Sequence, residues 1–202
     1  MTDPLIAEIH VEDLEGTRAV AGALSGVLRA GDLVALTGEM GAGKTAFTQA
    51  LAAALGVVGP VTSPTFTLAR SYPCAGGVEL VHADIYRLEQ LAEVVDLGLP
   101  EQLEEGALAV VEWGERGAPA LLPEHLAVAL TPGADDDERW IEVRPVGDPW
   151  VGRWPAVLAA LAPLDEAPLD EAPPDEAPLD EAPPGGAPPG GAPPGGAAGG
   201  GP

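Results

Sequence analysis

Apolar and polar residues alternate at the start of the chain and give way to longer periodic segments. Ala7, Ile9 and Val11 alternate with polar residues, which predicts a strand with one buried face. Asp13 is placed to cap a helix that runs to about Leu28. Further along, the pattern predicts buried strands at 33–36 and 107–111, a helix at 46–55, hairpins at 67–82 and 125–144, short helices at 89–95 and 101–105, and a last helix at 154–161. Together these elements predict an α/β fold with a mixed, largely parallel central sheet flanked by helices, plus antiparallel hairpins.

A glycine-rich turn ending in a lysine and a threonine lies between the strand at 33–36 and the helix at 46–55. It fits the G-x-x-x-x-G-K-[ST] pattern of phosphate-binding loops in the strand–turn–helix context of the P-loop NTPase fold. Glycines let backbone N–H groups converge, and the helix start adds the positive end of its dipole. Lys44, the only lysine, is placed to reach outer phosphates, and the Thr45 hydroxyl to bind Mg²⁺. The predicted nucleotide-binding loop comprises Gly38, Glu39, Met40, Gly41, Ala42, Gly43, Lys44 and Thr45.

Two acidic residues follow predicted strands. Glu112 comes after the apolar run at 107–111, which is the form of a Walker B strand whose carboxylate supports Mg²⁺ directly or through water. Asp84, at the end of the first hairpin, has two interpretations. In the first it belongs to the metal shell or holds the attacking water, and in the second it caps the following helix. The hydroxyl-rich segment at 62–67 is either a turn that opens a strand or a loop that senses the nucleotide.

The end of the chain has a different composition from the rest. From Ala162 it repeats APLDE or APPDE units, followed by APPGG units and a Gly/Ala-rich end. Proline removes backbone donors and the units offer few large apolar side chains, so this segment cannot build a core. We therefore expect one P-loop domain over residues 1–161 and a disordered, acidic tail over residues 162–202.

The charge of the chain is strongly negative. The full sequence has a formal net charge of −23, and residues 1–161 alone hold 24 acidic against 9 basic residues. Such a surface repels the nucleic-acid backbone, so if the protein acts on RNA, we expect a partner protein to bind the RNA. A single cysteine, Cys74, is typical of a reducing compartment, and no segment has the form of a signal peptide or a membrane span. These features predict a cytoplasmic protein with no membrane partner.

The histidines and the single lysine limit which metal ions and nucleotides the chain is expected to bind. The three histidines, His10, His82 and His125, share no ligand spacing, so we expect no transition-metal site. A GTPase would need a second lysine in its guanine-reading element, and the only lysine lies in the phosphate-binding pattern. The expected cofactors are therefore ATP and Mg²⁺.

Taken together, the motifs resemble those of the TsaE (YjeE) family of ATPases needed for threonylcarbamoyladenosine modification of tRNA. The resemblance covers roughly residues 5–145 and rests on four ordered segments: GEMGAGKT at 38–45, TSPTFTL at 62–68, HADIYRL at 82–88 and VEW at 111–113. It implies a small P-loop protein that hydrolyses ATP slowly and docks on the TsaD–TsaB pair. That pair transfers threonylcarbamoyl to the adenosine beside the anticodon, so the protein would meet tRNA only indirectly.

The resemblance also implies roles for individual residues. Thr45 and Glu112 would hold Mg²⁺, Lys44 the phosphates, and Asp84 would be essential for hydrolysis. Thr17 corresponds to a threonine near the nucleotide, and Arg139 to an arginine that borders the base. The roles of Arg87 and Arg116 stay open.

This chain departs from the family pattern in three places: Glu39-Met40 replaces Asp-Leu, Gly114 replaces proline, and the tail is additional. None of these residues is assigned to chemistry. Two alternatives stay open, a small-molecule kinase and a nucleotide-binding switch that does not hydrolyse. A kinase usually needs a mobile lid carrying several arginines, and the sequence contains no such segment.

Overall fold

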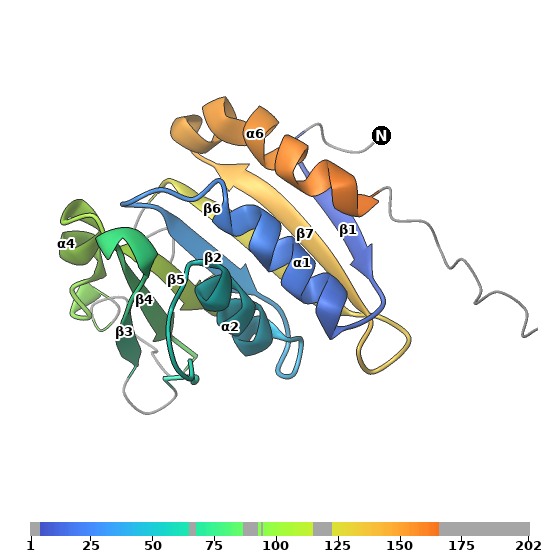
Figure 1. The fold of residues 1–202 in the computed structure, drawn as a ribbon, viewed down its shortest axis with the longest axis horizontal. Helices are drawn as coiled ribbons and strands as arrows, with labels where there is room; N and C mark the ends of the chain where they lie inside the picture. Colours follow the sequence, from blue (N-terminus) through green and yellow to red (C-terminus); the bar gives the residue numbers. More distant parts are fainter. Residues whose placement is uncertain (1–4, 65–67, 87–92, 94, 115–122, 166–202) are drawn as a thin grey trace, which may run out of the picture. The chain divides into compact units, whose positions relative to one another are not determined.

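A computed structural model of the protein describes residues 5–64, 68–86, 93, 95–114 and 123–165. This part forms a seven-stranded sheet with the order β1-β7-β6-β2-β5-β4-β3 (Figure 1). The central strands β6, β2, β5 and β4 run parallel, whereas β1, β7 and β3 pair antiparallel with their neighbours. The strands are β1 (Ala7–Val11), β2 (Leu33–Thr37), β3 (Ala69–Pro73), β4 (Glu79–Asp84), β5 (Leu108–Glu112), β6 (His125–Pro132) and β7 (Arg139–Val146).

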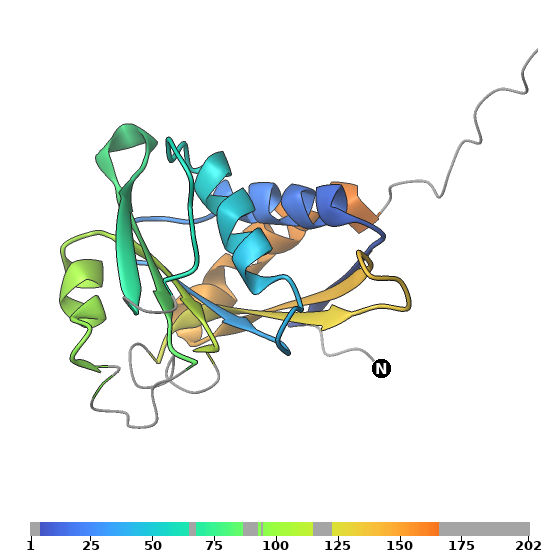
Figure 2. The same ribbon diagram turned by 90° about the horizontal axis from the view of Figure 1, so that it is seen from below.

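Helices cover the two faces of the sheet unequally. On one face lie α1 (Leu14–Ser25), α2 (Lys44–Ala54) and α6 (Asp148–Asp165), as Figure 2 shows. Leu24, Phe47 and Trp154 from these helices join one buried cluster with every second residue of the strands, such as Val34. The alternate residues of β2, β4 and β5 pack on the other face with Leu99 and Leu103 of α4 (Leu99–Glu104). The α/β fold with a mixed sheet predicted from the sequence is therefore confirmed.

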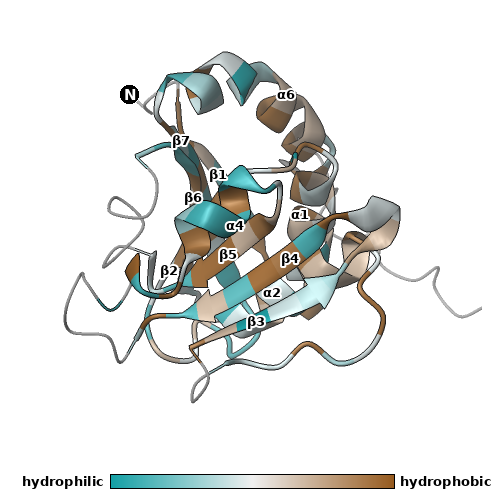
Figure 3. Ribbon diagram, turned by 90° about the vertical axis from the view of Figure 1, so that its left-hand side faces the viewer, coloured by the Kyte–Doolittle hydropathy of each residue, from teal (hydrophilic) through white to brown (hydrophobic). Residues whose placement is uncertain are grey.

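The centre of the sheet is apolar and its edge is polar. In Figure 3 the brown of β2, β5 and β4 gives way to the pale and teal colours of β3. Buried parallel strands read as continuous apolar runs, whereas an edge strand keeps polar residues that discourage pairing with another chain. A short 3₁₀ turn, η1 (Ala75–Gly77), joins β3 to β4. Within the described residues no helix is long and apolar enough to cross a membrane.

The helices differ from the predicted bounds mainly at their ends. Asp13 caps α1 as predicted, accepting a 2.8 Å hydrogen bond from the Gly16 N–H, but α1 ends at Ser25 and not near Leu28. Gly26 is the C-cap, with its backbone N–H bound to the Leu24 carbonyl, and the Val27 carbonyl just beyond it accepts a hydrogen bond from the Arg153 guanidinium. The helix predicted at 89–95 lies largely outside the described residues, as does the tail from residue 166.

The last helix is longer than predicted at both ends. It begins at Asp148 because Trp150, Trp154, Val157 and Leu161 form one buried stripe at helical spacing. It ends at Asp165, and Leu164 packs against the same core cluster. The prediction at 154–161 missed the first turn of this stripe.

The topology fixes where a site can form. Because β2, β5 and β4 are parallel, their carboxyl ends lie side by side along the carboxyl edge of the sheet, the edge that the ends of the strands form. The register pairs Asp84 with Glu112 and Glu112 with Leu36, so Glu112 lies beside the end of β2 and Asp84 beside Glu112. Ligands of open α/β sheets bind at this edge.

Candidate active site

The glycine-rich loop after β2 uses backbone conformations that side chains rarely adopt. Gly38, Gly41 and Gly43 have φ values of +136°, +84° and +102°. A Cβ atom at Gly38 would also collide with the carbonyl oxygen of Leu130 in β6. Gly43 precedes α2 and has no side chain to cap the first N–H groups of the helix. The loop can therefore offer backbone donors to an anion, as the sequence pattern predicts.

Lys44 lies across this loop. Its Nζ donates hydrogen bonds to the carbonyls of Gly38 (2.7 Å) and Glu39 (2.8 Å). The same ammonium lies 3.7 Å from the centre of the Trp113 ring, a cation–π contact. Only 5% of the residue is exposed, so the charge is held against the loop and the ring.

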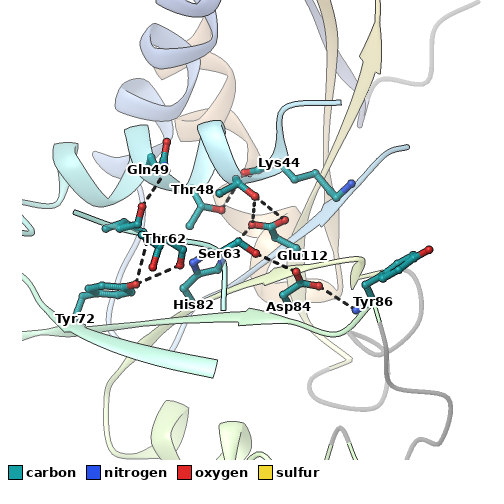
Figure 4. A network of polar contacts seen from close by, with 12 residues as sticks. Lys44, Thr48, Gln49, Thr62, Ser63, Tyr72, His82, Asp84, Tyr86 and Glu112 are labelled. Atoms are coloured by element: carbon teal, nitrogen blue, oxygen red, sulfur yellow. Dashed lines mark hydrogen bonds and ion pairs between the residues drawn. The ribbon is translucent and has the colours of Figure 1, made fainter. Parts of the chain in front are cut away.

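Thr45 and Glu112 meet at the start of α2 and the end of β5. The Thr45 hydroxyl lies 2.9 Å from Glu112 Oε1 and 3.1 Å from Oε2, so it donates to the carboxylate. Glu112 is buried, and His82 lies on its other side with Nε2 2.8 Å from Oε1 (Figure 4). The structure thus brings together the two residues predicted to share a metal ion.

Asp84 lies next to this pair and is 8% exposed. Its Oδ2 accepts a 3.1 Å hydrogen bond from the Ser63 hydroxyl, and its Oδ1 accepts one of 3.1 Å from the Tyr86 N–H. The second contact is an Asx turn, in which a side chain binds the backbone two residues on. Both carboxylate oxygens are therefore oriented by the chain itself.

These groups surround one cavity of about 360 Å³. Its size falls within the range typical of small-molecule sites, about 300 to 1,000 Å³. Met40, 73% exposed, forms part of the rim. The lining residues are Met40, Gly41, Gly43, Lys44, Thr45, Ala46, Ser63, Asp84, Tyr86, Glu112 and Trp113.

The chemistry of the lining suits a hard cation together with an anionic ligand. Within the described residues no three His, Cys, Asp or Glu side chains converge as a metal site on their own. A hydroxyl and a carboxylate are ligands that Mg²⁺ accepts when phosphate groups and water complete its shell. The arrangement can therefore hold Mg²⁺ together with a phosphorylated ligand.

The sequence model of one family, described as Threonylcarbamoyl adenosine biosynthesis protein TsaE, matches residues 11–141, which include every residue that lines the cavity. The chain belongs to the TsaE family. A TsaE protein of Streptomyces coelicolor is 44% identical over 147 residues, which are 70% of this chain and 99% of the relative. The Bacillus subtilis TsaE protein is 39% identical over 134 residues, or 66% and 82% of the two chains.

A solved structure has a similar fold. The crystal structure of Bacillus subtilis YdiB aligns with a TM-score of 0.62 at 30% sequence identity, covering 80% of this chain and 97% of that chain. This likeness agrees with the α/β architecture of the described residues.

Two residues predicted from the TsaE resemblance lie outside the cavity lining. Thr17 is buried in α1, where its hydroxyl donates to the Asp13 carbonyl at 3.4 Å. Arg139, at the start of β7, donates from Nε to the Ala42 carbonyl at 2.8 Å and from Nη2 to the Gly41 carbonyl at 3.4 Å. Arg139 therefore links the β6–β7 hairpin to the backbone of the glycine-rich loop. Gly38, Glu39 and Ala42 shape the loop without lining the cavity.

Several lining residues were not assigned from the sequence. Trp113 and Tyr86 pack with their ring centres 4.7 Å apart and their planes tilted by 42°, and both line the cavity, while the Ser63 hydroxyl donates to Asp84. Trp113 has a φ of +64°, which turns the chain just after Glu112. All three residues belong to the TsaE segments at 62–68, 82–88 and 111–113, so those segments were the available signal. Of the first segment, residues 65–67 are not described.

Proposed function

We propose that this chain is a Mg²⁺-dependent ATPase with a P-loop NTPase fold that serves threonylcarbamoyladenosine biosynthesis on tRNA in the cytoplasm, as a partner of TsaD and TsaB. One observation carries the proposal: Thr45 Oγ1 lies 2.9 Å from Glu112 Oε1 at a cavity bounded by the glycine-rich loop. The pathway follows from family membership and from relatives named "tRNA threonylcarbamoyladenosine biosynthesis protein TsaE".

Thr45 and Glu112 would hold the metal ion. Both present oxygen atoms at the carboxyl edge of the sheet, and their contact orients the hydroxyl and the carboxylate toward each other. Bound Mg²⁺ would neutralise charge on the phosphate oxygens of ATP. The buried setting strengthens this effect because little water competes there.

Lys44 and the loop amides would hold the phosphates. The ammonium already lies at the mouth of the loop, bound to two carbonyls and to the Trp113 ring. These partners are neutral, so an outer phosphate would attract the ammonium more strongly than they do. Lys44 would then exchange carbonyl contacts for phosphate contacts with a small movement of its side chain.

Asp84 would orient the attacking water. Its carboxylate lines the cavity and is fixed by Ser63 and the Tyr86 N–H, which leaves lone pairs for a water proton. A positioned base of this kind typically contributes about 10²- to 10⁴-fold to a rate.

The charge of the chain supports an indirect role toward tRNA. A net charge of −23 opposes binding of a polyanion, so TsaD and TsaB would hold the tRNA while this chain binds and hydrolyses ATP. A nucleotide-dependent change in docking would then couple hydrolysis to the partner complex.

Calorimetry and phosphate release test the proposal. Calorimetric titration should detect ATP binding that strengthens when Mg²⁺ replaces EDTA. Phosphate release should be slow for the chain alone and should rise when TsaD and TsaB are added. Labelled γ-phosphate recovered on a metabolite would indicate a kinase instead. No Mg²⁺-dependent uptake of ATP, even with the partner subunits present, would overturn the proposal.

A further inference from the structure

His82 is a polar residue in the apolar interior. It lies in β4, points to the same face as Leu80, and is 0% exposed. Its Nε2 lies 2.8 Å from Glu112 Oε1, while its Nδ1 is buried and has no hydrogen-bond partner in the described part of the chain. Among the described contacts, the hydrogen bonding of this imidazole is therefore directed at Glu112.

Packing alone does not explain an imidazole at this position. Burying a polar ring costs free energy unless its hydrogen bonds are made, and here one ring nitrogen is left without a bond. A leucine would fill a similar volume beside Leu80 and Val110 without that cost. The contact with Glu112 is what a leucine could not supply.

The contact determines how the Glu112 carboxylate is turned. A carboxylate oxygen only accepts hydrogen bonds, so the hydrogen of the bond lies on His82 Nε2. Oε1 then accepts from both His82 (2.8 Å) and the Thr45 hydroxyl (2.9 Å), whereas Oε2 has the longer Thr45 contact of 3.1 Å. Two donors on one oxygen fix the rotation of the carboxylate. Oε2 then keeps more of its lone-pair capacity for a further donor or a metal ion.

We propose that His82 is a positioning residue that holds Glu112 so that Oε2 faces the metal ion or its bound water. This inference rests on the proposed function, because it assigns His82 to the Mg²⁺ site of that ATPase. His82 acts only through Glu112: its Nε2 points at the carboxylate and its Nδ1 is enclosed, so it is neither a metal ligand nor a substrate contact. Partners of this kind typically change metal affinity by about 10- to 100-fold.

The experiment measures metal coupling in binding, without turnover. Calorimetry gives the ATP affinity of the full chain in Mg²⁺ and in EDTA, and the ratio of the two is the coupling. His82→Leu should lower the coupling by about 10- to 100-fold, with the affinity in EDTA unchanged. His82→Gln should keep most of it, because the glutamine amide N–H reaches the place of Nε2. His82→Asn should lose it, because its amide is too short.

A second buried histidine provides the control. His125 begins β6, which pairs parallel with β2. It therefore lies at the edge that the starts of the parallel strands form, opposite the edge that carries the loop. His125→Leu should keep the coupling of the unaltered chain. Thermal unfolding without nucleotide or metal reports whether each variant is folded.

The outcomes separate this inference from the proposed function. If the unaltered chain shows coupling and His82→Leu shows it equally, the role of His82 is overturned while the ATPase proposal stands. If His82→Leu does not fold, equal coupling in His82→Gln and His82→Asn overturns the role. If the unaltered chain shows no coupling, the Mg²⁺-ATPase proposal fails and the inference fails with it.

Discussion

The Thr45 hydroxyl lies 2.9 Å from Glu112 Oε1, although 67 positions separate the two residues in the chain. The sheet produces this proximity: β2 and β5 are parallel neighbours, and the register places Leu36 beside Glu112. The loop then returns the chain so that α2 begins over the end of β5. The glycine-rich loop and the acid after β5 therefore form a single site.

Replacing Glu112 by glutamine should uncouple ATP binding from the metal. The amide removes the negative charge and can turn an N–H toward Thr45 or His82, which both donate at present. Loss of a residue that only orients a metal ligand typically costs about 10- to 100-fold, so we expect the ATP affinity in Mg²⁺ to fall by at least this much, and the affinity in EDTA to stay the same or rise. Calorimetry with and without Mg²⁺ measures both. Glu79→Gln, at the opposite end of β4, is the matched control and should change neither.

Replacing Asp84 by asparagine should separate binding from turnover. The amide keeps the size of the side chain but loses the charge that would orient the attacking water. We expect ATP affinity within about twofold of the unaltered chain and phosphate release at least 100-fold slower. Asp96→Asn, an exposed acid, is the control. If Asp84→Asn keeps full turnover, the carboxylate is only a turn-forming group that binds the Tyr86 N–H.

Arg139 should stabilise the glycine-rich loop through hydrogen bonds to its backbone carbonyls. Its guanidinium reaches the Ala42 carbonyl and also the carbonyls of Asp136 and Glu138, both at 2.6 Å. Lysine cannot make this fork of contacts, so Arg139→Lys should lower the free energy of unfolding by about 1 to 2 kcal/mol and weaken ATP binding. Chemical denaturation and calorimetry measure the two effects. Arg144→Lys, exposed on the same strand, should be neutral; an equal loss there would mean that the loop contacts contribute nothing.

Glu138 should make the turn before β7 sensitive to acid. The pKa of its carboxyl is lowered from its ordinary value of about 4.5 by the Asp135 N–H, then by the His10 side chain and the Ala134 N–H. Because the folded pKa lies below the unfolded one, the stabilisation is complete above the unfolded pKa and is lost as the pH falls through the folded pKa. Glu138→Gln should therefore be less stable than the unaltered chain at neutral pH, and the difference should shrink in acid.

Urea denaturation at pH 7 and at pH 3 measures this difference. Glu142→Gln, whose carboxylate lies 4.0 Å from Arg144, is the matched control on the same hairpin. A difference for Glu138→Gln that is independent of pH would mean that the carboxylate charge plays no part in the turn.

The sequence predicted those parts of the site that depend on local structure. The β2–loop–α2 unit follows from one contiguous pattern, so its strand, glycines and helix start could be predicted together. The role of His82 could not, because it depends on the pairing of β4 with β5, which brings the imidazole to Glu112 across 30 positions. Spacing along the chain excluded His82 only as a metal ligand.

Tertiary contacts also explain the remaining differences. Arg139 meets the loop because β6 and β7 pair with a register that brings the start of β7 beside the end of β6. The contact of Arg153 with the Val27 carbonyl, just past the end of α1, joins residues 126 positions apart. Neither contact leaves a periodic signal, so sequence patterns could not reveal them.

Truncation of the tail tests where the folded domain ends. The predicted boundary after Leu161 would remove the last turn of α6, including Leu164, which packs against the core cluster. A chain that ends at Asp165 keeps α6 whole, and we expect its thermal midpoint and phosphate release to match those of the full chain. A chain that ends at Leu161 should lose about 1 to 2 kcal/mol of stability, because it exposes apolar surface that Leu164 covers.

Differential scanning calorimetry of the two truncated chains separates the possibilities. Substituting Leu164→Ala in the chain that ends at Asp165 isolates the side chain from the helix turn, and it should reproduce most of the loss. The repeats beyond this point are rich in proline, glycine and acidic residues, a composition that cannot add to a core. If the chain ending at Asp165 unfolds at a lower temperature than the full chain, the segment from residue 166 onward does contribute to the fold. The domain boundary proposed here would then lie too early.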